Sequence, residues 1–226
     1  MRIVIAGGHG NLARQLTREL SRGGHEVVGL IRNEEYRADL VADGAVPVVV
    51  DLEQATAEEV ASLLAGADVA VFAAGAGAGG SDARRKAVDL GASVLLADAA
   101  EIAGVLRFVQ VSSTGVDSVR NNARPSDVPK DFLSYLQAKL AAEEDLSRRS
   151  LDWTIVRPGG LTDDIGTGLV YLAHTGPERA ETRGTVPRAD VAAVLAELIR
   201  TGGGARETLH LLSGSVPVKA AVAAFA

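Results

Sequence analysis

Residues 1–16 read MRIVIAGGHGNLARQL, and this stretch decides the fold. Residues 2–6 form an apolar, β-branched run, which predicts a buried strand. Leucines at intervals of four residues then predict one face of a helix over residues 11–23. A strand, a glycine turn and a helix in this order leave backbone N–H groups free, and the helix N-terminus adds partial positive charge. The stretch therefore predicts a phosphate-binding turn.

The glycines of this turn are interpreted as space for a pyrophosphate. A side chain at Gly7 or Gly10 would keep the pyrophosphate away from the backbone, and the small Ala13 lets the helix pack closely on the strand. His9 has two interpretations, a phosphate contact or a solvent-facing loop residue. The alternative for the whole turn is a plain connector between a strand and a helix. The predicted phosphate ligands are Gly7, Gly8, His9, Gly10, Asn11 and Leu12.

Strands and helices alternate along the rest of the sequence. Strands are predicted at 3–6, 26–31, 46–50, 69–73, 108–112 and 153–157, and helices at 11–21, 57–64, 84–103 and 132–149. Apolar strands joined by helical crossovers predict an α/β fold, a doubly wound parallel sheet with helices on both faces. The regular alternation ends after Arg157. We expect a single domain over 1–226, in which residues from about 158 to 226 form a small C-terminal segment on the substrate side.

Composition and charge exclude several classes of function. The chain of 226 residues has no cysteine, which excludes disulfides, thiolate metal sites and cysteine nucleophiles. Its four histidines include no pair with metal-ligand spacing on one helix face, so no metal site is predicted. A net charge of −6 without a basic stripe argues against nucleic acid and anionic membranes as partners. Since neither a signal peptide nor a membrane-spanning apolar stretch is present, we expect a cytoplasmic protein, monomeric or homodimeric, with a small-molecule substrate.

The end of the second predicted strand indicates which dinucleotide the chain prefers. In dinucleotide folds an acidic residue about 20 residues past the glycines usually binds the ribose 2′-hydroxyl. This sequence reads GLIRNEEY there, with Arg32 at that place. A guanidinium suits the 2′-phosphate of NADP and stacks on adenine, so NADP is the predicted cofactor and NAD the alternative. The other interpretation of Arg32 is a solvated arginine balanced by Glu34 and Glu35.

The ends of the third and fourth predicted strands carry further cofactor candidates. After the third strand, VVVDLEQ offers Asp51 to accept from the adenine amino group and Leu52 to flank the ring. After the fourth strand, FAAGAGAGG offers small residues that let a cofactor lie against the backbone. These small residues are Ala73, Ala74 and Gly75.

The segment DFLSYLQAKLAAEEDL, residues 131–146, carries the main signal of chemistry. Tyr135 and Lys139 are four residues apart on a helical pattern, so their side chains share one face. An ammonium beside a phenol stabilises the phenolate. Such a phenol exchanges a proton with an alcohol or carbonyl while a hydride moves to or from the cofactor. The alternative is a surface helix that carries an unrelated pair.

The ends of the fifth and sixth predicted strands favour the catalytic interpretation. FVQVSSTGVD ends the fifth strand with three hydroxyls, those of Ser112, Ser113 and Thr114. TIVRPGGLTD ends the sixth strand with four residues that are predicted to border the nicotinamide. They are Arg157, Pro158, Gly159 and Gly160.

Together these motifs resemble the short-chain dehydrogenase/reductase family, in its atypical and extended branches with NAD(P)-binding, NmrA-like and epimerase-like members. IAGGHGNLA resembles the phosphate loop, DL the adenine contact, AAGAG the ribose-side loop, VSSTG the serine-bearing strand end and YLQAK the tyrosine–lysine pair. The resemblance runs over nearly the whole chain and implies a Rossmann fold with an NAD(P) cofactor. It further implies that Tyr135 is the acid/base, that Lys139 contacts the cofactor ribose and tunes the phenol, and that Ser112 contacts the cofactor. Either Ser113 or Thr114 then binds the substrate carbonyl.

Two departures narrow what the resemblance implies. Ala13 stands where the epimerase branch usually has the last glycine of its phosphate loop. The segment after Arg157 is short, which disfavours a nucleotide-sugar substrate and leaves a small carbonyl, quinone or flavin-like one. Two functions of different class follow, an NADPH-dependent reductase and an NmrA-like, non-catalytic NADP-binding redox sensor that partners with another protein. A third interpretation is a cofactor-binding protein with residual reductase activity.

Overall fold

The computed structural model describes residues 1–76, 80–126, 128–175 and 184–226. Its strands are β1 (Arg2–Ala6), β2 (Glu26–Ile31), β3 (Ala45–Val49), β4 (Val69–Phe72), β5 (Arg107–Val111), β6 (Asp152–Pro158), β7 (Gly160–Thr162), β8 (Leu169–His174), β9 (Thr185–Pro187), β10 (Glu207–Ser213) and β11 (Val216–Pro217). Its α-helices are α1 (Asn11–Arg22), α2 (Arg37–Ala42), α3 (Ala57–Leu63), α4 (Asp82–Arg85), α5 (Ser93–Ala103), α6 (Lys130–Leu146), α7 (Arg188–Thr201) and α8 (Val218–Ala223). Shorter helical segments are the 3-10 segments η1 (Glu34–Tyr36) and η3 (Val116–Asn122) and the π segment η2 (Lys86–Ala92).

The central sheet has the doubly wound strand order. Within the described ranges, nine strands follow one another in the order β11-β8-β10-β6-β5-β4-β1-β2-β3. From β3 to β10 every neighbouring pair is parallel, because helical crossovers return the chain to the same edge before each new strand. The strand order reverses direction between β1 and β4. The predicted α/β fold with a parallel sheet is confirmed, and it is of the Rossmann type.

The far edge of the sheet differs from the fully parallel prediction. β8 pairs antiparallel with β10, and β11 pairs antiparallel with β8. β7 and β9 form a separate parallel pair. These strands belong to the segment after Arg157, where the sequence is rich in Gly, Thr and charged residues. Because they are short and partly exposed, they lack the continuous apolar run that marks a buried parallel strand.

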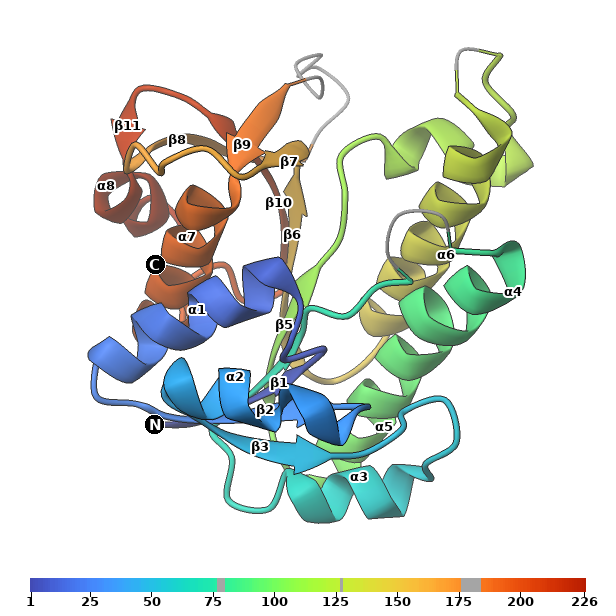
Figure 1. Cartoon of the computed structure of the whole chain (residues 1–226). Coiled ribbons are helices and arrows are strands. Elements are labelled where there is room, and N and C mark those ends of the chain that lie inside the picture. Colours follow the sequence, from blue (N-terminus) through green and yellow to red (C-terminus); the bar gives the residue numbers. More distant parts are fainter. Residues whose placement is uncertain (77–79, 127, 176–183) are drawn as a thin grey trace.

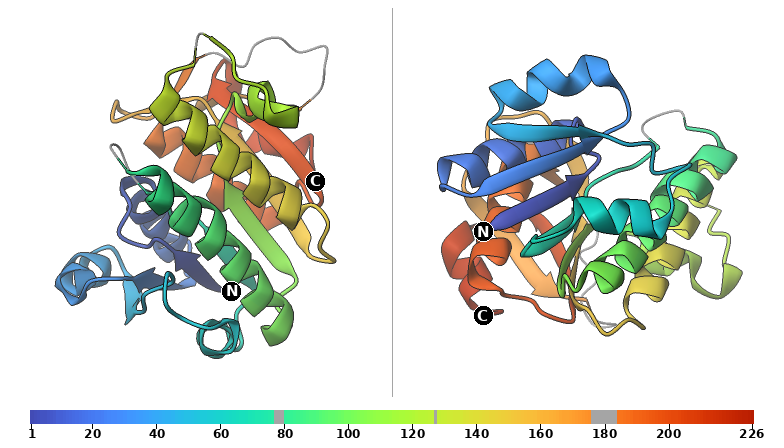
Figure 2. Two further views of the ribbon diagram at one scale, coloured as in Figure 1. Left: turned by 90° about the vertical axis from the view of Figure 1, so that its right-hand side faces the viewer. Right: turned by 90° about the horizontal axis from the view of Figure 1, so that it is seen from below.

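Two helical layers cover the sheet (Figure 1). α1, α7 and α8 lie on one face and α3, α5 and α6 on the other, as the two views of Figure 2 also show. Ile3 and Ile5 of β1 pack with Leu16 in the first layer, and Val4 packs with Leu96 in the second. Successive side chains of a strand point to opposite faces. Because both faces of β1 are buried, its consecutive residues are apolar.

The long helix predicted over 84–103 consists of three segments. α4 ends at Arg85, the π segment η2 covers Lys86–Ala92, and α5 continues from Ser93. Hydrogen bonds in a π turn run from residue i to i+5, so the turn is wider than an α turn, and such turns are frequent at functional sites. Both Arg85 and Asp89 of this region are buried against the cavity described below.

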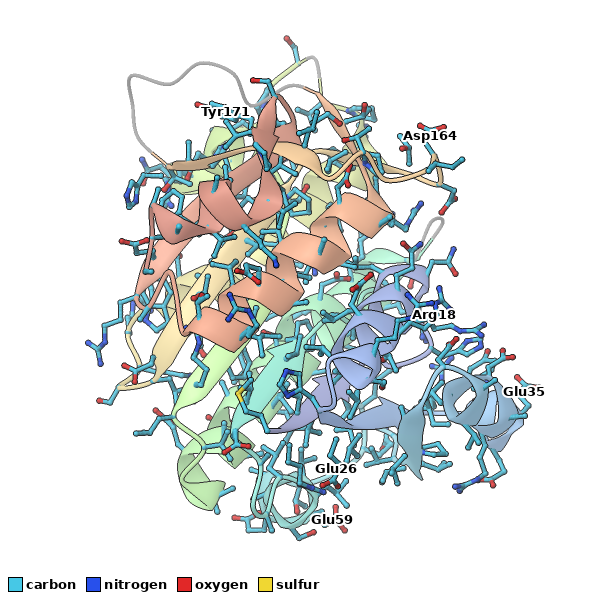
Figure 3. The ribbon with its side chains drawn as sticks, turned by 90° about the vertical axis from the view of Figure 1, so that its left-hand side faces the viewer. Arg18, Glu26, Glu35, Glu59, Asp164 and Tyr171 are labelled. Atoms are coloured by element: carbon cyan, nitrogen blue, oxygen red, sulfur yellow. The ribbon has the colours of Figure 1, made fainter. Side chains whose placement is uncertain are left out.

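Charged side chains on the outer surface point to solvent. In Figure 3, Glu26, Glu35, Glu59 and Asp164 project from the outside of the molecule, and each is exposed.

Within the described ranges, no helix has the length and apolar character that a membrane span requires. In the same ranges, no three His, Asp or Glu side chains are grouped so that they would hold a metal ion.

Candidate active site

Two adjoining cavities open at the carboxyl ends of β1, β4 and β5. This is beside the point where the strand order reverses, which is where doubly wound sheets bind their ligands. The small cavity has a volume of about 290 Å³ and the large cavity about 1160 Å³. Because Gly10 and residues 73–75 line both, the two cavities form one groove.

The structure brings most of the predicted site residues to the walls of this groove. The small cavity is lined by Gly7, His9, Gly10, Arg32, Asp51, Leu52, Ala73, Ala74 and Gly75. The large cavity is lined by Gly10, Asn11, Leu12, Ala73, Ala74, Gly75, Ser112, Ser113, Thr114, Tyr135, Lys139, Pro158, Gly159 and Gly160. Two predicted residues, Gly8 and Arg157, line neither cavity.

The phosphate turn keeps the start of α1 open to the groove. Gly10 precedes the helix, no side chain caps its first turn, and no acidic residue lies in that turn. Gly10, Asn11 and Leu12 line the large cavity. Free N–H groups and the positive end of the helix dipole at a cavity wall suit a phosphate.

Close packing against the neighbouring strands also requires glycine in this turn, which the sequence alone did not indicate. A Cβ on Gly7 would lie 2.6 Å from Cα of Ala74, and the φ angle of Gly7 is +78°. A Cβ on Gly8 would lie 2.9 Å from Cα of Gly29, so Gly8 packs on β2 instead of facing a phosphate. Gly7 and Gly8 are therefore required where the turn crosses the neighbouring strands, and the prediction that Gly8 lines the phosphate site is corrected.

An aromatic pair forms one wall of the small cavity. His9 and Tyr36 stack with ring centroids 3.8 Å apart and ring planes 5° apart. His9 Nε2 lies 2.8 Å from Asp39 Oδ2. The His9 ring is thus held in place by two neighbours and is not a freely solvated loop side chain. Tyr36 was not among the predicted residues, because it lies in the 3-10 segment η1, which carries no periodic signal.

Arg32 belongs to a three-residue ion-pair cluster on the wall of the small cavity. Arg32 Nη1 lies 3.2 Å from Glu53 Oε1, and Arg84 Nη1 lies 3.3 Å from the same oxygen. Sequence reasoning identified Arg32 alone, since its partners follow other strands and only the fold brings them together. The carboxylate of Asp51 accepts the N–H of Glu53 at 3.0 Å and so shapes the turn that presents Glu53. Leu52 lines the cavity between them.

α6 presents Tyr135 to the large cavity. The Tyr135 ring is partly buried, packs against the cluster of Val116 and Leu136, and lies 5.3 Å from the Phe132 ring, centroid to centroid. Within the described ranges, the Tyr135 hydroxyl makes no hydrogen bond to the protein. The phenol is therefore fixed by its ring and leaves its hydroxyl available to a ligand in the cavity.

Lys139 forms a buried ion pair one turn further along α6. Its Nζ lies 3.2 Å from Asp89 Oδ1 and donates to the carbonyl oxygens of Val111 at 3.2 Å and Ala74 at 3.4 Å. The same Nζ lies 5.8 Å from the centroid of the Tyr135 ring. An ammonium has three N–H donors. Two carbonyl oxygens accept hydrogen bonds from this ammonium and Asp89 pairs with it electrostatically, so a contact with a ribose uses the remaining N–H or replaces the bond to Ala74, the longer of the two.

The hydroxyls at the end of β5 differ in their hydrogen bonding. Ser113 Oγ donates to the Thr114 carbonyl at 3.0 Å. Ser112 is buried and its Oγ has no partner within the described ranges. Asp89 Oδ1, on the same cavity wall, likewise accepts no hydrogen bond, although it attracts Lys139 electrostatically. Buried polar atoms without partners are rare, so the orphaned Ser112 hydroxyl fits a site that a bound ligand completes.

Arg157 does not reach the groove, which corrects its prediction as a cofactor ligand. In β6 its side chain points toward α6, where its guanidinium lies 2.5 Å from Glu143 Oε2 and 2.6 Å from Asp117 Oδ2. Burial lowers the pKa of Arg157, but the bonds to Glu143 and Asp117 outweigh burial and raise it. Pro158 and the following glycines do line the large cavity. A Cβ on Gly159 would lie 2.4 Å from the carbonyl oxygen of Gly184, so this glycine is required by packing.

Comparisons with known proteins agree with this geometry. A family model described as NAD(P)H-binding matches residues 7–201. "Uncharacterized sugar epimerase YhfK" of Bacillus subtilis is 30% identical and is matched over 98% of this chain and 99% of its own length. A Bacillus halodurans structure described as a candidate NAD-dependent epimerase/dehydratase gives a TM-score of 0.87 at 35% identity and covers 99% of both chains. ChuY, an anaerobillin reductase from Escherichia coli O157:H7, gives a TM-score of 0.78 at 26% identity, covering 94% of this chain and 97% of ChuY.

Fold, groove and relatives define an oxidoreductase-like protein that binds a nicotinamide dinucleotide. The chain belongs to the NAD(P)H-binding family whose model spans residues 7–201. The resemblance to the atypical short-chain dehydrogenase/reductase branch is thereby confirmed.

Proposed function

We propose that this protein is an NADPH-dependent reductase of a small carbonyl, quinone or flavin-like compound. The observation that most supports this function is the large cavity, where Tyr135, Lys139 and Thr114 face the same space as the phosphate turn. ChuY, a structural relative, is described as a reductase, which supports the same class of reaction.

The walls of the groove fit the parts of the cofactor, which supplies a hydride when it is bound. In this proposal the backbone N–H groups of Asn11 and Leu12 bind the pyrophosphate. The small cavity takes the adenosine, with Leu52 against the ring and residues 73–75 beneath the ribose. Ser112, Pro158, Gly159 and Gly160 border the nicotinamide.

The proposed preference for NADPH rests on Arg32 and also on Arg84. Both guanidiniums lie near Glu53 at the small cavity. Ion pairs between exposed side chains are weak, whereas a doubly charged phosphate accepts several charge-assisted hydrogen bonds. The 2′-phosphate of NADPH therefore competes well with Glu53 for the two arginines, and the 2′-hydroxyl of NADH does not.

The proposed acid is Tyr135. Its hydroxyl proton moves to the carbonyl oxygen while the carbonyl carbon accepts the hydride, so that the C=O group becomes an alcohol and Tyr135 a phenolate. Lys139 stabilises the phenolate electrostatically, and water returns the proton. Thr114 is the proposed donor to the carbonyl oxygen, since Ser113 already donates its hydroxyl proton to the backbone.

Single-turnover oxidation of NADPH with a panel of aldehydes, quinones and flavins tests this function. Tyr135→Phe keeps the ring packing but removes the proton, so the rate should fall about 10²–10⁴-fold while NADPH still binds. Tyr171→Phe makes the same change on β8, outside both cavities, and serves as the control.

Two outcomes contradict the proposal in different ways. If Tyr135→Phe reacts as fast as the parent protein, Tyr135 is not the acid. If the dinucleotide binds but no compound in the panel oxidises NADPH, the non-catalytic sensor is the better assignment.

A further inference from the structure

The charges on the wall of the large cavity do not cancel. Within the described ranges, the charged side chains of this wall are Arg85, Asp89, Lys139 and Arg188. Asp89 and Lys139 lie 3.2 Å apart and neutralise each other. The carboxylates that pair with the two arginines, Asp82 and Asp163, are mostly exposed and do not line the cavity. The described wall of the cavity is therefore electropositive.

Arg85 is the more deeply buried of these arginines. Its side chain is 10% exposed, whereas that of Arg188 is 22% exposed. Arg85 Nη1 donates to Ser134 Oγ at 2.8 Å and to Asp82 Oδ1 at 3.3 Å. Its Nε and Nη2 donate to no residue of the described ranges. These two nitrogens carry guanidinium N–H donors that remain available to a ligand in the cavity, and such donors favour a ligand that supplies charged acceptors.

Arg85 also lies close to the proposed acid. Its partner Ser134 is the residue before Tyr135 on α6, and α4 packs beside α6 (Figure 1). Arg85 and Tyr135 line the same cavity. A ligand group held by Arg85 is thereby anchored next to the turn of α6 that carries the phenol.

From these observations we infer that the substrate carries an oxyanion, a carboxylate or a phosphate, that Arg85 binds. Guanidinium donors match carboxylate and phosphate oxygens in geometry as well as in charge. Arg188, at the start of α7, adds a second positive charge to the cavity. The inference deepens the proposed function and rests on it for the position of the reacting carbonyl.

Matched pairs of compounds isolate the contribution of the negative charge. The value of kcat/KM with NADPH is measured for 4-carboxybenzaldehyde and anthraquinone-2-carboxylate, each against its methyl ester. A third pair compares 4-formylphenyl phosphate with 4-methoxybenzaldehyde and so distinguishes phosphate from carboxylate. A charge-assisted contact corresponds to about tenfold to a hundredfold in affinity, so the preferred anion should exceed its neutral partner by at least about tenfold.

Binding is measured separately from turnover. Titration calorimetry on the protein saturated with NADP⁺, which has no hydride to transfer, reports the affinity for each acid and each ester. The expected result is the same preference for the anion as in the kinetics.

Variants at neighbouring positions assign the effect to Arg85. Arg85→Gln should lower the acid-to-ester ratio by about tenfold or more, and Arg188→Gln should lower it less. Lys86→Gln makes the same charge change one residue further on, at an exposed position outside both cavities, and should leave the ratio unchanged. If Arg85→Gln does not fold, Arg85→Lys keeps the charge, loses the fork of donors and should give an intermediate ratio.

Three results separate this inference from the proposed function. Equal rates and affinities for acids and esters in the parent protein overturn the anionic substrate. An Arg85→Gln variant that loses NADP⁺ affinity as strongly as acid affinity also overturns it, because Arg85 then belongs to the cofactor site. Acids that bind through Arg85 but are never reduced support the anion site and contradict the reductase function.

Discussion

The ion pairs at the small and the large cavity differ in burial: those at the small cavity are partly exposed, and the pair at the large cavity is buried. At the small cavity, Arg32 and Arg84 are 47% and 38% exposed where they meet Glu53. At the large cavity, Lys139 and Asp89 are 5% and 0% exposed. Exposed pairs contribute about 0–1 kcal/mol to stability, whereas removing one partner of a buried pair costs about 3–5 kcal/mol. The ion pairs of the proposed cofactor-specifying end therefore contribute little to the stability of the fold, whereas the pair at the proposed reactive end contributes strongly.

The largest expected effect is the loss of folding stability when the buried pair of Lys139 and Asp89 is broken. Lys139→Met leaves Asp89 buried without its counter-charge, so the free energy of unfolding should fall by about 3–5 kcal/mol. Adding Asp89→Asn removes the orphaned charge while the amide oxygen can still accept the Ala76 N–H, so the double variant should regain part of this loss. Urea denaturation followed by the fluorescence of Trp153 measures both. A double variant as unstable as the sum of its single changes would contradict the ionic interpretation.

The next largest effect is on cofactor preference. Arg32→Ala should reduce the ratio of NADPH to NADH affinity by about tenfold to a hundredfold, because a charge-assisted phosphate contact is worth about 1.5–3 kcal/mol. The stability of this variant should change by no more than about 0.5 kcal/mol, as for other surface substitutions. Arg37→Ala removes an exposed arginine that lines neither cavity and is the control. Equal affinities for the two dinucleotides in the parent protein would contradict the proposed role of Arg32 in NADPH preference.

Replacing Glu53 should have a smaller effect on the preference for the 2′-phosphate, and it should raise that preference instead of lowering it. Glu53→Gln removes the carboxylate that competes with the 2′-phosphate, so affinity for 2′,5′-ADP should rise by about two- to fivefold relative to 5′-ADP. Arg84→Ala should shift the same ratio downward. Calorimetry with these two fragments tests the small cavity without any requirement for catalysis. A Glu53→Gln variant that binds both fragments more weakly by the same factor would mean that Glu53 holds the adenosine itself.

The smallest effect on stability is expected at Asp117, an exposed carboxylate that pairs with the buried Arg157. Burial raises the pKa of Asp117, but Arg157 and Arg120 outweigh burial and lower it from 3.8. Because the folded-state pKa is depressed, this stabilisation is complete above about pH 4 and is lost as the pH falls through the folded-state value. Asp117→Asn should therefore be less stable than the parent at pH 7, and the two stabilities should converge in acid. Parallel stability curves from pH 7 to pH 2.5 would rule this linkage out.

Local patterns in the sequence predict the strand–turn–helix unit well. β1 and α1 are each defined by the spacing of apolar residues over a few turns, and the glycines lie between them. The same spacing does not reveal the π segment η2, because its two ends continue the helical pattern of α4 and α5. Strand β8, which lies next to the edge strand β11, is missed since it is half exposed and has no continuous apolar run.

Site residues are predictable from the sequence where they follow a strand directly or share one face of a helix. Tyr135 and Lys139 are visible because they lie one turn apart on a helix. Asp89 and Glu53 give no such signal, as each meets its partner only after the sheet has formed. Arg157 looks like a ligand because it lies at a strand end, yet the alternation of β6 turns its side chain under α6.

The π segment makes the wall of the large cavity sensitive to chain length. An α-helix turns by about 100° per residue, and the wider turn of η2 is equivalent to one inserted residue. Deleting one residue within Lys86–Ala92 would restore a regular α-helix between α4 and α5 without rotating either, and it would change which side chains of this segment, Asp89 among them, face the cavity. The sheet, α5 and the phosphate turn would keep their places. A single-codon deletion at this point would thus alter one wall of the large cavity and leave the phosphate turn unchanged.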